Sequence, residues 1–169
     1  MKKGKVDKFT LTVIVENKFG VLARIAGLFS ARGFNIHSLA VSETEDPTIS
    51  CMTIVVIADE KILEQIKKQL NKLIDVVEVI DLTNRQYEER ELVLINIKVT
   101  SKTKDDIMRV IHTMGAEILD VGKNTITIEE TGDTKKINSI IELLRPFGIK
   151  EVVRTGKIAI QTEGEKREN

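Results

Sequence analysis

The stretch Glu16-Asn17-Lys18-Phe19-Gly20-Val21-Leu22 holds the residues with the clearest potential for binding chemistry. It joins a β-branched alternating run to a helical pattern, so the first amides of the helix have no partner within the helix. Such N–H groups, at the positive end of the helix dipole, favour a small anion such as a carboxylate. Gly20 removes a side chain that would block close approach, and Asn17 offers both a donor and an acceptor. The turn therefore predicts an anion-binding site.

Asn35 and Ile36 form a second candidate, at the start of the next predicted strand. We expect this strand to pair between subunits, so that Asn35 faces the turn of a neighbouring molecule. An amino acid needs N–H donors, oxygen acceptors and an apolar wall, which the turn, Asn35, and Ile36 or Leu22 together supply. Asn17 and Gly20 also suit an ordinary turn, because Asn and Gly are common there. The residues alone leave both interpretations open.

The elements that position these residues follow the order β-α-β-β-α-β in the first half of the chain. Strands are predicted from alternating β-branched residues, and helices from apolar residues at helical spacing. Charges and a proline suit a hairpin loop between the second and third strands. The predicted strands cover 9–15, 34–42, 49–57 and 76–82, and the predicted helices cover 21–29 and 62–73.

The same order repeats in the second half. We expect a last strand that is bent at Gly156 and a helix that stops before Pro146. The predicted strands here cover 92–99, 116–121, 125–129 and 150–161, and the predicted helices cover 104–113 and 137–144.

This repeat predicts an α+β fold of two tandem ferredoxin-like βαββαβ domains. Units of this size are marginal when alone, so we expect the halves to associate, between chains or within one. The predicted segments are a first domain at 9–82, a polar linker at 83–90, a second domain at 91–161, and flexible tails at 1–8 and 162–169.

Composition argues against several classes of function. With 26 basic and 26 acidic residues the formal net charge is zero, which gives no global attraction to nucleic acid or to an anionic membrane. An aromatic content of 4% argues against base stacking on the sheet. The single Cys51 lies in an alternating apolar run, so we expect a small core or half-buried residue and a reducing compartment. Without a signal peptide or an apolar span, we expect a cytoplasmic protein.

Catalytic and metal-binding patterns find little support. The two histidines, His37 and His112, lie in different predicted domains, without a ligand at suitable spacing. No phosphate-binding glycine loop or nucleophile elbow is present. We interpret Arg24 and Arg32 as solvated helix charges, and the run Glu88-Glu89-Arg90-Glu91 as a hydrated surface. No catalytic residue and no metal ligand is therefore predicted.

Several segments resemble one known family. The first unit looks like an ACT domain, an amino-acid-binding ferredoxin-like module. The run from Val15 to Ile36 is similar to the opening of acetolactate synthase small subunits, and so is the run from Thr44 to Ile54. The segment from Lys61 to Leu73 and the junction Arg90-Glu91-Leu92 extend the resemblance, which covers nearly the whole of 9–99.

The resemblance implies a non-catalytic regulatory subunit of acetolactate synthase, in branched-chain amino acid biosynthesis. Such a subunit dimerises through its ACT domains, stimulates the catalytic (large) subunit and confers feedback inhibition by valine, or by leucine or isoleucine. It implies no cofactor in this chain, and thiamine diphosphate, magnesium and FAD in the catalytic partner. No nucleic acid or membrane partner is implied.

The resemblance also implies particular effector positions. His37 departs from the family, whose members commonly have Glu at this point, so any contact through that carboxylate is in question. The family's effector-binding positions correspond here to Asn17, Gly20, Val21, Leu22, Asn35 and Ile36, with Ser42 and Gln65 as outer positions that affect feedback sensitivity.

Two other functions stay open. A free-standing ACT-type sensor that controls transcription would need a DNA-binding element, and the two predicted units leave no spare helix-turn-helix segment. A small enzyme is a further alternative, because a fold does not fix a function.

Overall fold

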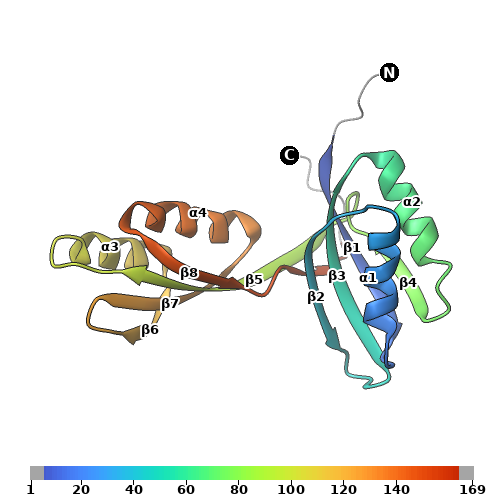
Figure 1. The fold of residues 1–169 in the computed structure, drawn as a ribbon, viewed down its shortest axis with the longest axis horizontal. Helices are drawn as coiled ribbons and strands as arrows, with labels where there is room; N and C mark the ends of the chain where they lie inside the picture. The colour runs from blue at the N-terminus through green and yellow to red at the C-terminus, as the bar shows by residue number, and fades with distance from the viewer. Residues whose placement is uncertain (1–5, 164–169) are drawn as a thin grey trace. The chain divides into compact units, whose positions relative to one another are not determined.

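The computed structural model describes residues 6–163, which form two compact units. The N-terminal unit contains the chain up to Glu88 and the segment from Ile158 onward, and the C-terminal unit contains Glu89–Lys157. Each unit follows the βαββαβ order, so the predicted tandem ferredoxin-like fold is confirmed (Figure 1). The elements of the N-terminal unit are β1 (Asp7–Glu16), α1 (Val21–Ala31), β2 (Ile36–Glu43), β3 (Ile49–Ala58), α2 (Glu60–Leu70) and β4 (Val76–Asp81).

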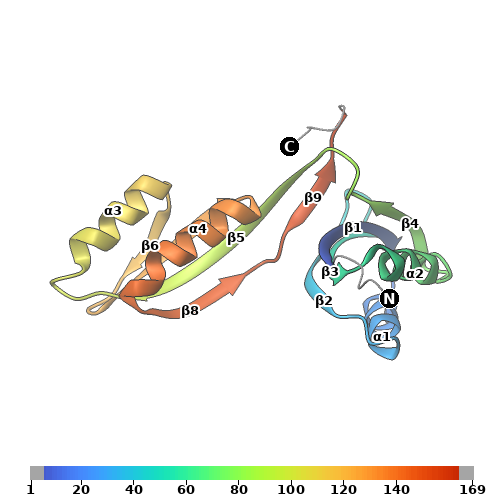
Figure 2. The same cartoon turned by 90° about the horizontal axis from the view of Figure 1, so that it is seen from above.

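The N-terminal sheet has the strand order β2-β3-β1-β4, with β2 at one edge. All its pairings are antiparallel, and Leu11 lies opposite Ile54 in the register of β1 and β3. Period-two alternation sends one set of side chains from each strand to the same face. Helices α1 and α2 cover that face (Figures 1 and 2).

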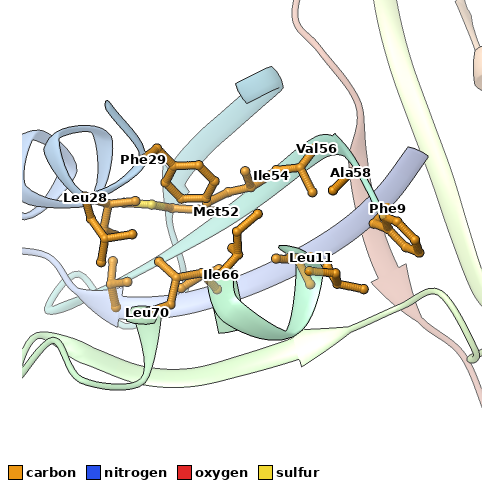
Figure 3. Close-up of a cluster of buried hydrophobic side chains, with 14 of the residues drawn as sticks. Phe9, Leu11, Leu28, Phe29, Met52, Ile54, Val56, Ala58, Ile66 and Leu70 are labelled. Atoms are coloured by element: carbon orange, nitrogen blue, oxygen red, sulfur yellow. The ribbon is translucent and has the colours of Figure 1, made fainter. Parts of the chain in front are cut away.

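The core of the N-terminal unit lies between these helices and the sheet. Figure 3 shows side chains of α1 and α2 meeting those of β1 and β3. Phe29 and Phe34 add an edge-to-face pair at the end of α1, with ring centroids 6.4 Å apart. The contributing side chains include Phe9, Leu11, Leu28, Phe29, Met52, Ile54, Val56, Ala58, Ile66 and Leu70.

The C-terminal unit repeats this arrangement in a sheet of order β6-β7-β5-β8. Its core is rich in isoleucine, and α3 and α4 lie over one face of its sheet (Figure 1). Its elements are β5 (Tyr87–Lys98), α3 (Lys104–Met114), β6 (Glu117–Val121), β7 (Thr125–Gly132), α4 (Thr134–Leu144), a short 3-10 turn (Arg145–Phe147) and β8 (Ile149–Arg154). β5 begins in the N-terminal unit at Tyr87.

The end of the chain differs from the single strand predicted over 150–161. The chain forms β8 and then a separate strand, β9 (Ile158–Gln161). Gly156, between them, has φ +76°, a left-handed conformation that glycine adopts without strain. β9 pairs with β5 and belongs with the N-terminal unit, where the Ala159 N–H donates to Thr53 Oγ1 at 3.3 Å. The predicted bend is thus a full break between two strands.

The structure also differs from the linker expected at 83–90 and from the hydrated surface expected at Glu88-Glu89-Arg90-Glu91. β5 already begins at Tyr87, inside the range 83–90. Glu91 is buried and accepts two hydrogen bonds from Arg154, and Glu89 pairs with Lys157 at 2.6 Å. The interpretation of these two glutamates as hydrated was wrong, because their partners lie more than 60 residues away in sequence.

The expected tails overlap only partly with the described residues. Asp7 and Lys8 belong to β1, where they pair with the end of β3. Residues 1–5 and 164–169 lie outside the described residues. Among the helices within 6–163, none combines the length and the apolar character that spanning a membrane requires.

Candidate functional site

The turn between β1 and α1 has the backbone geometry of an open helix terminus. Gly20, the N-cap residue, has φ +82° and ψ −5°, and no side chain caps the helix. By contrast, the Asp59 carboxylate caps α2 by accepting from the Ile62 N–H at 2.8 Å. A glycine is favoured at this φ because an L side chain would be strained there. The space and the N–H donors that a capping side chain would use therefore stay open at the start of α1.

The first amides of α1 are available to a ligand. The first helical bond runs from the Arg24 N–H to the Gly20 carbonyl at 2.9 Å. Within residues 6–163, the backbone N–H groups of Gly20, Leu22 and Ala23 donate to no backbone carbonyl. Leu22 is exposed and Val21 is buried, so the turn has one apolar side chain beside these donors. The turn thus places backbone N–H groups beside an exposed apolar side chain, and the binding of an effector there stays a prediction.

Asn17 has a structural role that the sequence did not predict. Its backbone N–H donates to the Thr48 carbonyl at 2.6 Å, and its side-chain Nδ2 donates to the Pro47 carbonyl at 2.8 Å. Asn17 thus fastens the turn to the loop between β2 and β3. One of its two side-chain amide hydrogens is used in this way, which leaves the Oδ1 acceptor and the second hydrogen for a ligand.

Asn35 and Ile36 lie away from the turn within one chain. They follow the end of α1, whose 11 residues extend over about 16 Å. Ile36 pairs with Val56, which lies opposite Phe9 near the start of β1, whereas the turn follows the end of β1. A single chain therefore does not bring the two candidate asparagines together.

The two outer positions are both exposed. Ser42 pairs with Cys51, which lies opposite Ile14, so Ser42 is at the same end of the sheet as the turn. Gln65 lies on α2, four residues before Gln69 and hence on the same side of that helix.

The chain also matches known proteins. Residues 11–78 match the model of the AHAS small subunit-like ACT domain, and residues 90–163 match that of the small subunit of acetolactate synthase. The acetolactate synthase small subunit of Aquifex aeolicus is 49% identical over 164 residues, which cover 96% of this chain and 85% of that protein. This chain belongs to the acetolactate synthase small-subunit family. The resemblance seen in the sequence is thus confirmed.

Other members of the small-subunit family agree in sequence and in structure. The acetolactate synthase small subunit of Mycobacterium leprae is 46% identical over 151 residues, which cover 89% of each chain. The crystal structure of the Thermotoga maritima acetolactate synthase small subunit superposes with a TM-score of 0.83 at 35% identity, covering 94% of this chain and 99% of that one. Because residues 90–163 match the small-subunit model, the family assignment also covers the C-terminal unit.

Arg24 and Arg32 of this small-subunit chain are exposed helix charges, as predicted, but each also has a partner that the sequence did not indicate. Arg24 forms an ion pair with Asp75, and the whole Asp75 residue is 8% exposed. Arg32 donates to the Leu28 carbonyl and to Gln69 Oε1. These partners, Asp75 and Gln69, are 51 and 37 residues away in sequence. The sequence shows only the spacing of the charges along the helix, so it did not predict these contacts.

Within the described residues, no group of three or more His, Cys, Asp or Glu side chains is arranged to hold a metal ion. Cys51 is half-buried as predicted, and burial raises the pKa of its thiol, which lowers the fraction of reactive thiolate.

Proposed function

We propose that this chain is the regulatory subunit of acetolactate synthase. In this proposal it binds and stimulates the catalytic subunit and makes that subunit sensitive to valine, or to leucine or isoleucine. Family membership supports the regulatory assignment. The single observation that supports effector binding is the uncapped, glycine-led start of α1. Thiamine diphosphate, magnesium and FAD belong to the catalytic partner in this proposal, and this chain has no cofactor.

The turn suits the carboxylate of an amino acid. The open N–H groups of Leu22 and Ala23 lie at the positive end of α1, where a carboxylate is stabilised. Gly20 allows close approach, and the exposed side chain of Leu22 supplies an apolar contact. The free acceptor of Asn17 suits the ammonium group.

A two-fold dimer would complete this site. β2 is an edge strand, and an edge strand pairs readily with a second copy of itself. Antiparallel pairing about the middle of β2 (Ile36–Glu43) brings the start of β2 beside the end of the same strand in the partner subunit. Asn35 then lies beside the partner's β2–β3 loop, to which the partner's Asn17 is fastened in the same way as Asn17 here. The geometry thus explains how residues separated within one chain would share one effector.

Regulation requires that the effector bind one arrangement of the complex more tightly than another. A coupling free energy of roughly 1–3 kcal/mol is ordinary for such a system. In this proposal, valine bound between two ACT domains changes their packing or rigidity, and the catalytic subunit responds to that change.

The test combines the purified chain with the acetolactate synthase catalytic subunit from the same organism. We expect co-elution of the two chains, higher acetolactate production than from the catalytic subunit alone, and inhibition by at least one branched-chain amino acid. Light scattering of the isolated chain should give the mass of a dimer. Failure to co-elute and to stimulate would refute the regulatory assignment, and acetolactate production by the isolated chain would refute its non-catalytic role.

A further inference from the structure

Arg24 and Asp75 adjoin the turn that forms the proposed effector site. Arg24 Nε donates to Asp75 Oδ2 at 2.8 Å, and Arg24 Nη2 lies 2.7 Å from the same oxygen. The backbone carbonyl of Asp75 also accepts from the Glu16 N–H at 2.9 Å. Asp75 therefore contacts both the end of β1 and the first turn of α1, the two segments that the turn joins.

This pair fixes the direction of the guanidinium group. The Asp75 side chain is 11% exposed and the Arg24 side chain is 49% exposed, so a buried carboxylate anchors a group that reaches solvent. Nε and Nη2 face Asp75, and the remaining nitrogen, Nη1, lies 3.3 Å from the position that a Cβ on Gly20 would take. Arg24 Nη1 thus borders the space that the missing side chain of Gly20 leaves open.

The formal charges of the pair cancel. The Asp75 carboxylate offsets the Arg24 guanidinium, and the first turn of α1 has no acidic residue. Lys18 in the turn is likewise paired, with Glu16 at 2.8 Å. The turn therefore offers directional donors, from Nη1 and the open amides, without a net formal charge from these four side chains. Such a site suits a zwitterion, whose own charges cancel, better than a simple anion.

We propose that Arg24 Nη1 donates to the effector carboxylate. In the same proposal, Asp75 is a positioning residue that orients Arg24 and balances its charge, so that the site selects a zwitterionic amino acid over a simple anion. This inference rests on the proposed function, because it concerns the same effector site. It adds two residues that lie outside the effector positions implied by the family.

The first test measures binding of valine, leucine and isoleucine to the full chain by calorimetry. Arg24→Gln should weaken binding of the preferred amino acid by at least about tenfold, the loss expected for a charge-assisted hydrogen bond. Arg24→Lys keeps the charge but not the two-point contact with Asp75, so its loss should be smaller. Arg32→Gln is the matched control, because Arg32 bonds to Leu28 and Gln69 instead, and it should change the affinity by less than about twofold.

The second test addresses the selectivity that Asp75 confers. Asp75→Asn leaves the Arg24 charge without compensation and keeps the backbone carbonyl that accepts from Glu16. We compare valine with 3-methyl-2-oxobutanoate, a simple anion with the same side chain. The ratio of the two affinities should shift by at least about threefold toward the anion. A loss of stability alone would weaken both ligands alike and leave the ratio unchanged.

The outcomes separate this inference from the proposed function. If the wild-type chain bound none of the three amino acids, the proposed effector site itself would fail. If the wild-type chain bound one of them and Arg24→Gln bound it equally well, only the role of Arg24 would be lost. An unchanged affinity ratio in Asp75→Asn would overturn the role of Asp75 while leaving that of Arg24.

Discussion

At the scale of single residues, Gly20 combines a backbone requirement with the proposed binding chemistry. Its left-handed conformation ends the turn, and its missing side chain leaves room beside Arg24 Nη1. Arg24 shows the same dependence on its surroundings, because a helix arginine becomes a fixed donor only through Asp75. The proposed role of Gly20 thus depends on Arg24, and that of Arg24 depends on Asp75.

Replacing Gly20 tests the site without removing an existing contact. Gly20→Asp should cost about 1 kcal/mol of stability, because a non-glycine residue is strained at this φ. Its carboxylate would stand beside Arg24 and repel the effector carboxylate, so valine affinity measured by calorimetry should fall at least about tenfold. Gly20→Asn is the matched control, because asparagine has the same shape and no charge. Equal affinities in the two variants would argue against a carboxylate at this turn.

At the scale of elements, a half-buried ion pair helps to connect a strand with a helix in the C-terminal unit. Glu89 in β5 pairs with Lys157 and also accepts from the Thr134 N–H at the start of α4. Both side chains of the pair are less than 20% exposed, at 17% for Glu89 and 14% for Lys157. One carboxylate thus joins a strand, a helix terminus and the segment after β8.

The pKa of Glu89 predicts how this connection responds to acid. Burial alone would raise the pKa, but the hydrogen bonds from Lys157 and Thr134 outweigh it and hold the pKa below its usual value. A carboxyl group with a lowered folded-state pKa stabilises the fold at neutral pH, and this stabilisation is lost as the pH falls through that pKa. Glu89→Gln should therefore destabilise the C-terminal unit by about 1–3 kcal/mol at neutral pH.

The difference between wild type and Glu89→Gln should shrink at acidic pH. As the pH falls through the lowered pKa of Glu89, the wild-type carboxyl group becomes protonated, so both proteins lack the charge. Urea unfolding at several pH values, followed by hydrogen exchange of α4, measures this. Glu151→Gln, at an exposed position of β8, should show little change at any pH. A pH-independent difference for Glu89→Gln would contradict the ion-pair explanation.

At the scale of the whole molecule, the N-terminal unit includes the end of the chain. β9 lies against β3 through the Ala159–Thr53 contact, and Arg85 Nη1 donates to Gln161 Oε1. Thr53 is buried although it points away from the helix-covered core, since its neighbours Met52 and Ile54 point into that core. The N-terminal unit is thus built from two separate stretches of sequence.

Deleting the chain from Ile158 onward should selectively weaken the N-terminal unit. Loss of β9 removes hydrogen bonds and exposes Thr53, so we expect a loss of about 1–3 kcal/mol. Hydrogen exchange should accelerate in β3 and stay unchanged in the core strand β7. A chain that ends at Thr162 keeps β9 and is the control. Equal protection of β3 in both chains would show that β9 contributes no stability to this unit.

The sequence by itself determined the order of the elements, the fold class and the position of the turn. These follow from local periodicity, because apolar residues repeat at the spacing of a strand or a helix and glycine marks the breaks. The family was also visible, because its motifs are contiguous runs such as the one from Val15 to Ile36. The sequence therefore predicted the part of the candidate site that lies within one such contiguous run.

Only the tertiary structure decided which residues meet. The partners of Arg24 and Glu91 are 51 and 63 residues away, so charges that appeared solvated are paired. The side-chain bond from Asn17 to Pro47 and the placement of β9 with the N-terminal unit arise in the same way. The spacing of residues along the chain indicates which side of a helix or strand each residue occupies. It does not indicate which residue of another element packs against that side, because that depends on the tertiary structure.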